Sequence, residues 1–301
     1  MIMNSLVIGT RGSPLALAQT EIARGLLQTA HPGLAIEVKI IKTSGDNFTN
    51  LSLVAGGGKG LFTKEIEDQL LREEIDLAVH SMKDLPTIVP DGLTIGAVPA
   101  RENAHDVFVS KKVASVQELT KGARVATSSI RRRAQLLARR PDLQIEEIRG
   151  NVETRLRKLV ENDALDALIL AAAGLRRLGL WKKDASLHWQ EIDFDVMIPA
   201  VGQGAIACEA READANTCKM LASINDTDTA ACTMAERAFL QALGGGCQVP
   251  YAAHATVDGE RLRLIGAVFS HDGRQVSRVE AIGSKADPRE LGERAAKQAI
   301  G

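Results

Sequence analysis

The sequence has few aromatic residues and almost no net charge, and each scarcity excludes a class of protein. Two Trp, one Tyr and six Phe make up 3% of the 301 residues. That is too few for a platform on which nucleic-acid bases stack. The 37 Lys and Arg stand against 38 Asp and Glu, a formal net charge of -1, so no overall field draws the chain to nucleic acid or to an anionic membrane. An anionic ligand must therefore be held by local charge.

Cysteines and long hydrophobic runs are also scarce. The four cysteines all lie in the last third of the chain and form no Cys-x-x-Cys pair, which favours reduced thiols over disulfides or a zinc site. The longest apolar run, Ala167–Leu175, is too short to cross a bilayer, and Met1–Thr10 carries no basic leader of the signal-peptide kind. We expect a cytoplasmic protein without a metal.

Strands followed by tight turns and helices recur along the first two thirds of the chain. The apolar run Leu6–Gly9 leads through Ser13 and Pro14 into apolar residues at helical spacing, which predicts a helix with Ser13 as its N-cap. The same order follows Arg124–Ala126 and Gln144–Ile148. Alternating strands and helices are typical of parallel sheets, which bind ligands at the carboxyl ends of their strands. We therefore expect two α/β domains that face each other.

The last ~75 residues have a different pattern. Ala252–Val257, Arg261–Val268 and Gln275–Ile282 alternate or run apolar, and Asp-Gly pairs at 258–259 and 272–273 separate them. Such pairs indicate hairpins, so we expect a small antiparallel sheet with helices, one of them near Thr227–Leu243.

Three strand-to-helix junctions combine arginines with hydroxyl or amide side chains. Helix-start N–H groups, hydroxyls and guanidinium groups together bind carboxylates or phosphates. A single junction is explained as well by helix capping beside solvated arginines, but three in one α/β frame favour a cleft that binds a polyanion. The residues are Arg11 and Ser13; Ser129, Arg131 and Arg132; and Arg149, Asn151 and Arg155.

The segment 123–158 carries ten basic and four acidic residues, an excess of six positive charges. A basic RNA-binding face is the competing interpretation. The segment has no interleaved aromatic residues, and its arginines stand at strand ends, which suits a concave pocket better than a flat nucleic-acid surface.

Two further positions could carry chemistry. Asp84, next to Lys83 just past a predicted strand, could stabilise a developing cation or accept a proton, although a loop ion pair is the commoner reason for such a pair. Cys247 follows three glycines, which would leave its thiol accessible as a nucleophile or covalent tether. A structural thiol at a glycine-capped helix end fits the sequence equally well.

Seven motifs, in order over nearly the whole chain, closely resemble the porphobilinogen deaminase family, also called hydroxymethylbilane synthases. The motifs are IGTRGSPLAL at 8–17, GGKGLF at 57–62, HSMKDLP at 80–86, TSSIRR at 127–132, RGNV at 149–152, PAVGQG at 199–204 and GGCQVP at 245–250. One departure is the segment 101–106, which lacks the Asp and Pro-Arg common at this point in the family.

The resemblance implies an α/β fold of three domains. Residues 1–100 and 204–224 would form domain 1, and residues 105–198 would form domain 2. Both would resemble the lobes of periplasmic binding proteins and face a cleft. Residues 227–301 would form a small α+β domain 3 with an antiparallel sheet, and this domain carries Cys247.

The resemblance also implies an activity, that of a transferase in tetrapyrrole and haem biosynthesis. A dipyrromethane cofactor, held by a thioether to Cys247, would prime the head-to-tail condensation of four porphobilinogen molecules with loss of ammonia. Hydrolysis would then release hydroxymethylbilane. Such a protein is a monomer that needs neither nucleic acid nor a membrane. A non-catalytic two-lobed anion-binding protein is the alternative, but it would give Cys247 no role.

The resemblance assigns roles to particular residues. Asp84 would be catalytic, because a fixed anion stabilises the azafulvenium cation left when ammonia departs. The acetate and propionate groups of the pyrroles need guanidinium and hydroxyl donors. The cofactor would be bound by Lys83, Asp84, Ser129, Arg131, Arg132 and Cys247, and the substrate by Arg11, Ser13, Lys59, Arg149, Arg155 and Arg177.

Overall fold

The computed structural model describes residues 5–47, 60–245 and 250–300. They fall into two compact units. Unit 1 comprises Met1–Arg101 and Ala205–Ala231, and unit 2 comprises Glu102–Gly204 and Cys232–Gly301. Each unit is thus assembled from two separate stretches of the chain.

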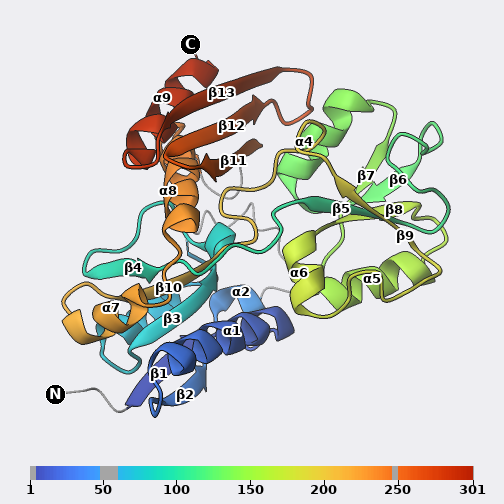
Figure 1. The fold of residues 1–301 in the computed structure, drawn as a ribbon. Helices are drawn as coiled ribbons and strands as arrows, with labels where there is room; N and C mark the ends of the chain where they lie inside the picture. The colour runs from blue at the N-terminus through green and yellow to red at the C-terminus, as the bar shows by residue number, and fades with distance from the viewer. Residues whose placement is uncertain (1–4, 48–59, 246–249, 301) are drawn as a thin grey trace. The chain divides into compact units, whose positions relative to one another are not determined.

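Unit 1 is built on a five-stranded sheet with the order β2-β1-β3-β10-β4 (Figure 1). Its strands are β1 (Ser5–Thr10), β2 (Ala35–Ile40), β3 (Leu77–Ser81), β4 (Leu93–Ala97) and β10 (Ile206–Arg211). Its helices are α1 (Pro14–Ala30), α2 (Ser44–Asn47), α3 (Lys64–Leu71), the 3-10 helix η1 (Met82–Asp84) and α7 (Ala215–Ala222). Strand β1 runs parallel to β2 and β3, whereas β10 runs antiparallel to β3 and β4.

The two faces of this sheet form separate cores because side chains alternate along a strand. On one face Leu77 and Val79 of β3 belong to a core with Leu27 of α1. On the other face Ala78 of β3 belongs to a core with Ile66 of α3. Helices therefore cover both faces, and the carboxyl ends of β1 and β3 lead into the residues predicted to bind ligand.

Unit 2 contains a second five-stranded sheet with the order β7-β6-β8-β5-β9. Its strands are β5 (Asp106–Ser110), β6 (Arg124–Ala126), β7 (Gln144–Glu146), β8 (Ala167–Ala171) and β9 (His188–Ile192), and its helices are α4 (Ile130–Arg139), α5 (Val152–Glu161) and α6 (Ala172–Arg177). Strand β6 is parallel to β7 and β8, and β5 is antiparallel to β8 and β9.

The two sheets share one plan, in which three parallel strands are followed by an antiparallel one. We expected parallel sheets; three strands of each sheet are parallel as expected, and one strand beside them is reversed. The reversed strands, β10 and β5, are the first strands that each sheet receives after the chain passes from one unit to the other at 204–205 and 101–102. No helical crossover joins them to their neighbours, so the constraint that makes adjacent strands parallel does not apply.

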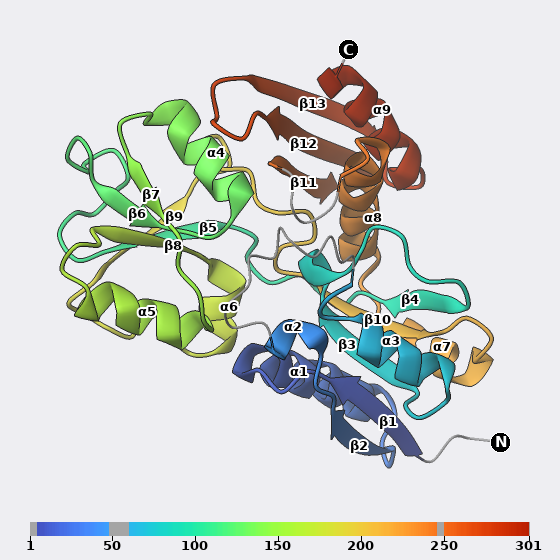
Figure 2. The same cartoon turned by 180° about the vertical axis from the view of Figure 1, so that it is seen from behind.

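The predicted antiparallel C-terminal sheet is present in the order β11-β12-β13. Its elements are α8 (Thr227–Ala242), β11 (Tyr251–Asp258), β12 (Arg261–Phe269), β13 (Val276–Ser284) and α9 (Pro288–Ile300). Figure 2 shows α8 and α9 beside this sheet, and Phe239 and Leu291 from these helices share a core with Leu264 of β12. The α/β fold class with a small α+β C-terminal part is therefore confirmed.

The C-terminal sheet also packs on the preceding part of unit 2. Ala252 and Ala267 of this sheet share a buried cluster with Ala134 of α4 and with Ile198. Because α4 carries Arg131 and Arg132, this contact ties the predicted ligand-binding helix to the sheet.

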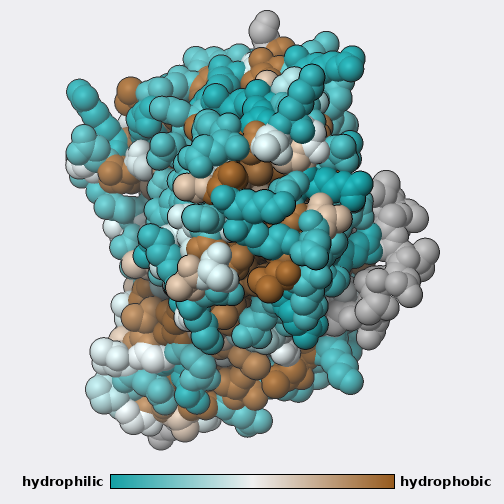
Figure 3. Space-filling view, turned by 90° about the vertical axis from the view of Figure 1, so that its right-hand side faces the viewer, coloured by the Kyte–Doolittle hydropathy of each residue, from teal (hydrophilic) through white to brown (hydrophobic). Residues whose placement is uncertain are grey.

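The surface is mostly hydrophilic on the face that Figure 3 shows, where brown hydrophobic groups are interleaved with teal hydrophilic ones. Exposed hydrophobic residues such as Ile88 and Ile300 do occur in the described chain. Within the described ranges, none of the helices combines the length and the hydrophobicity that crossing a bilayer requires.

Candidate active site

The three predicted junctions all begin helices, and their polar side chains cap them. Ser13, Ser129 and Asn151 each accept a hydrogen bond from the backbone amide three residues later, at 3.3, 3.4 and 2.8 Å. These helices follow β1, β6 and β7 directly. The capping interpretation therefore holds for each junction, and each cap leaves a helix start with N–H groups at the end of a strand.

In unit 1, three predicted residues line one pocket. Arg11, Ser13 and Asp84 meet there, together with Phe62 and Ser81. The guanidinium carbon of Arg11 lies 4.3 Å from the ring centroid of Phe62, a cation–π contact that fixes its direction. The pocket is completed by Leu15, Ala16, Gln19, Thr63, Val79 and His80.

This pocket presents opposite charges on different elements. Asp84 is the exposed last residue of η1, and Arg11 follows β1. A ligand with a carboxylate at one end and a cationic or N–H group at the other would match both. Lys83 precedes Asp84 on η1 and is half-buried, and it is not among the residues that line this pocket.

In unit 2, Arg131 and Arg132 converge on Asp106, which sequence analysis did not single out. An Arg131 Nη1–Asp106 Oδ2 contact and an Arg132 Nη2–Asp106 Oδ1 contact both measure 2.7 Å. The three residues are 5%, 6% and 0% exposed. Burial raises the pKa of Asp106, but the charges of the two arginines outweigh it and hold that pKa well below its usual range.

This cluster carries one net positive charge, because two guanidinium groups share a single carboxylate. Arg131 Nη1 also donates to the carbonyl of Ile198 at 2.7 Å, and Arg132 Nη1 to that of Ile169 at 2.9 Å. Within the described part of the chain, the buried Nε of Arg131 has no hydrogen-bond acceptor, and burial lowers the pKa of this arginine. The cluster therefore keeps an excess positive charge and one N–H group that no described residue accepts.

The remaining predicted arginines of unit 2 are less enclosed. Arg177 is half-buried and donates from Nη2 to the carbonyl of Gly204 at 2.8 Å, and burial lowers its pKa. Arg149 is exposed and lies 3.5 Å from Glu147, and Arg155 donates from Nε to the carbonyl of Gly150 at 2.8 Å. Lys59 and Cys247 lie outside the described residues.

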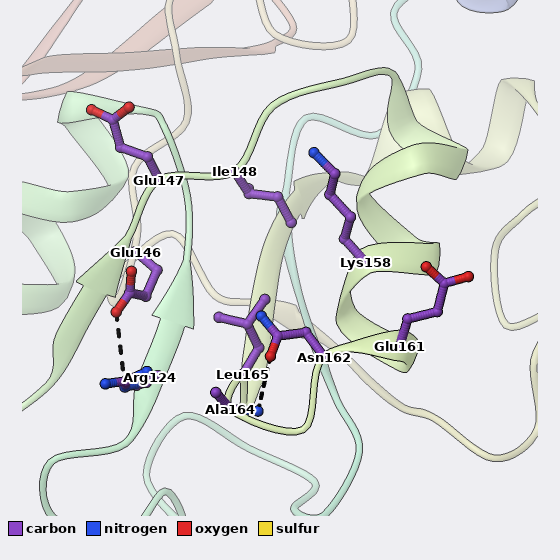
Figure 4. Close-up of a pocket in the computed structure, with 9 residues that line it drawn as sticks. All are labelled: Arg124, Glu146, Glu147, Ile148, Lys158, Glu161, Asn162, Ala164 and Leu165. Carbon is purple, nitrogen blue, oxygen red and sulfur yellow. Dashed lines mark hydrogen bonds and ion pairs between the residues drawn. The ribbon is translucent and has the colours of Figure 1, made fainter.

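A larger cavity of about 390 Å³ in unit 2 contains none of the predicted site residues (Figure 4). Three glutamates line it, against one arginine and one lysine, and Arg124 lies 3.8 Å from Glu146. This balance repels an anion carrying several carboxylates, so the candidate site is not this cavity. The lining residues are Arg124, Glu146, Glu147, Ile148, Lys158, Glu161, Asn162, Ala164 and Leu165.

Comparison with known proteins identifies the family. Among solved structures, the second substrate-binding domain of Lactococcus lactis GlnP shares 11% identity with a TM-score of 0.46, covering 72% of this chain and 86% of that chain. The porphobilinogen deaminase of Trichlorobacter lovleyi is 52% identical over 97% of this chain and 92% of its own. That of Acidithiobacillus ferrooxidans is 52% identical over 96% and 92%.

Family descriptions match nearly the whole chain. Residues 6–219 match "Porphobilinogen deaminase, dipyromethane cofactor binding domain", and residues 230–301 match the C-terminal domain of the same enzyme. This chain belongs to the porphobilinogen deaminase family.

Proposed function

We propose that this chain is a transferase that joins four porphobilinogen molecules head to tail on a dipyrromethane primer and releases hydroxymethylbilane. The observation that supports this most directly is the unit 1 pocket. It is lined by Arg11, which can bind a carboxylate, and by Asp84, which can stabilise a developing cation. The identity of about 52% with porphobilinogen deaminases supports it independently.

The residues of unit 2 fit a dipyrromethane cofactor. Its two pyrroles carry four carboxylates, and the Arg131–Arg132–Asp106 cluster has an uncompensated positive charge and an Nε–H without an acceptor among the described residues. Arg131 and Arg132 would hold carboxylates of the cofactor, Ser129 would add a hydroxyl donor, and Cys247 would hold the thioether. When bound, the group supplies the pyrrole carbon to which the first porphobilinogen is joined.

The residues of unit 1 would bind and activate porphobilinogen. Arg11 and Ser13 donate hydrogen bonds to its acetate or propionate, since a guanidinium pairs well with a carboxylate. The carboxylate of Asp84 lies where positive charge develops as ammonia leaves, and a preorganised anion there lowers the barrier. We retain the prediction that Lys83 and Asp84 bind the cofactor. We likewise retain the prediction that the substrate is bound by Lys59, Arg149, Arg155 and Arg177.

Intact-protein mass spectrometry tests this proposal. The purified protein, incubated with porphobilinogen, should carry an adduct of two pyrrole units and release ammonia on turnover. Cys247→Ala should abolish the adduct, whereas Cys218→Ala, which removes a partly buried thiol, should retain it. A protein that only binds anions would take up porphobilinogen without releasing ammonia. That outcome, or an unmodified Cys247, would refute the proposal.

A further inference from the structure

A cluster of buried titratable side chains lies behind the unit 1 pocket, on the α3 side of the sheet. Side chains alternate along a strand, so His80 lies on the same face as Ala78, which packs against α3. The antiparallel register places Glu209 of β10 opposite Ala78, and therefore on that face as well. Glu67 of α3 completes the cluster from above the sheet.

The three side chains are almost completely enclosed. His80 Nε2 lies 3.1 Å from Glu209 Oε2, and their side chains are 3% and 0% exposed. Glu67 is 6% exposed. Burial raises its pKa, and the charge of Glu209 raises it further. Among the described residues, Oε1 of Glu67 and Oε1 of Glu209 have no hydrogen-bond partner.

Structural stability alone does not account for this cluster. Two carboxylates buried beside one histidine cost desolvation energy, and apolar residues of similar volume would serve the core as well or better. Buried ionisable groups that adjoin a ligand pocket are candidates for a role in its chemistry.

His80 is the member that joins the cluster to the pocket. It lines the pocket that also contains Asp84 and Arg11, whereas Glu67 and Glu209 do not. The charged groups that face His80 are therefore Glu209 from β10, Glu67 from α3, and Arg11 and Asp84 across the pocket. The imidazole of His80 is therefore the titratable side chain of the cluster that adjoins the pocket, and the two carboxylates lie behind it in the enclosed part of the unit.

The reaction proposed above requires such an exchange. Porphobilinogen enters with its amine as ammonium, the C–N bond breaks, and ammonia leaves. A C–C bond forms to the α-carbon of the receiving pyrrole, which then loses its α-hydrogen as a proton. Ammonia regains that proton, so ammonium is the product and charge balances in each cycle.

We propose that His80 carries this proton, with Glu209 and Glu67 as the buried carboxylates that stabilise its charged form. Once the C–C bond has formed, neutral His80 accepts the proton that leaves the α-carbon. The imidazolium then passes this proton to the ammonia already released by C–N cleavage, which leaves the pocket as ammonium. Asp84 serves only to stabilise the cation, so the cation-stabilising and proton-carrying roles fall to different residues. The inference rests on the proposed function of the same site.

The test compares His80→Gln with His254→Gln. Glutamine keeps a hydrogen-bonding group but cannot titrate. His254 is a matched control, because it is also buried (7% exposed), lies 3.5 Å from a glutamate, Glu236, and belongs to β11 in unit 2. His80→Gln should still acquire the two-pyrrole adduct and unfold near the wild-type temperature. Its kcat should fall about 100-fold with KM within a few-fold, as expected on removal of a general acid–base group.

Two readouts separate proton transfer from a structural role. The pH profile of kcat should lose one limb in His80→Gln and keep it in His254→Gln. In histidine NMR spectra of the resting enzyme, the signal missing from His80→Gln should shift in Glu209→Gln. Equal kcat losses in both His variants, or a kcat profile unchanged by His80→Gln, would overturn the inference.

A second variant tests the inference if His80→Gln does not fold. Glu209→Gln retains the hydrogen bond to His80 and removes only the charge, and kcat should fall about tenfold or more; wild-type kcat would overturn the inference. A wild-type protein that never acquires the adduct contradicts the proposed function instead, so the two failures are distinguishable.

Discussion

Asp106 shows how one residue can orient the side chains that bind a ligand without contacting the ligand itself. Its carboxylate receives both guanidinium groups of Arg131 and Arg132 at 2.7 Å in a fully buried position. Isolated, either arginine would be costly to bury; paired with one shared anion, both are held in fixed directions. Asp106 neutralises only one of the two guanidinium charges. The remaining positive charge attracts an anion.

We predict that Asp106→Asn destabilises the protein strongly. Two buried guanidinium groups would lose their counter-charge, which costs about 3–5 kcal/mol. Urea unfolding of the variant and of the wild type measures the difference. The matched control is Glu280→Gln, which breaks a surface pair with Arg263 whose side chains are about half exposed, and its effect should be far smaller. Equal effects of the two variants would contradict the shared-anion interpretation.

The pH dependence of stability gives this prediction a sign. The pKa of Asp106 is depressed in the folded protein. Its contribution is therefore complete above the ordinary carboxyl pKa of about 3.9 and is lost as the pH falls from there toward the folded-state pKa. As the pH falls below about 3.9, the unfolding free energy of the wild type should therefore decrease more than that of Asp106→Asn.

Residue-level prediction from the sequence succeeded where the signal was local and failed where it was not. Ser13 and Ser129 could be identified as helix caps because capping depends on the next three residues. Asp106 gave only a weak signal, a single acid opening the apolar run at 107–109. Glu209 contacts His80 across 129 positions, and only strand register brings such residues together.

At the scale of elements, the same distinction applies. The hairpins of the C-terminal sheet were predictable, because Asp258-Gly259 and Asp272-Gly273 supply the left-handed conformation that tight turns need, with φ of +59° and +72° at the glycines. The place and direction of β5 and β10 were not, because an apolar run does not reveal its partner strand. The mixed sheets follow from those two strands.

The turn at Gly273 also positions α4, and this makes a prediction. A Cβ at Gly273 would lie 2.4 Å from the carbonyl oxygen of Ala134 in α4, whereas one at Gly259 would meet nothing within 4 Å. Both glycines have positive φ, so alanine at either should cost about 1–2 kcal/mol. Only Gly273→Ala must also push α4 away, and it should be the more destabilising variant.

The consequence of Gly273→Ala should extend to ligand binding, because α4 carries Arg131 and Arg132. We expect a smaller fraction of Gly273→Ala than of Gly259→Ala to carry the two-pyrrole adduct by intact mass. Equal stability and equal loading of the two variants would show that the turn does not position this helix.

At the scale of the whole molecule, binding of an anion is a local property. The chain is nearly neutral overall, yet residues 123–158 carry an excess of six positive charges. The charges are also sorted within unit 2, with glutamates around the 390 Å³ cavity and buried arginines around Asp106. A polycarboxylate is therefore directed by short-range contacts rather than by the field of the whole protein.

If those contacts hold the cofactor, the loaded protein must be more stable than the unloaded one. A ligand that binds only the folded state stabilises it by about 2.7 kcal/mol when present at 100 times its Kd. At an unfolding entropy of about 2.1 cal/mol/K per residue, this is a rise in Tm of roughly 4 °C for a chain of 301 residues. Cys247→Ser, which cannot form the thioether, should therefore unfold at a Tm lower by that amount, whereas Cys218→Ser should load normally and match the wild type. Differential scanning calorimetry of proteins whose loading has been verified by mass makes the comparison. Equal unfolding temperatures of the loaded wild type and Cys247→Ser would contradict this prediction. The carboxylates of the cofactor would then not neutralise the residual positive charge of the Arg131–Arg132–Asp106 cluster, and that charge would need another counter-ion.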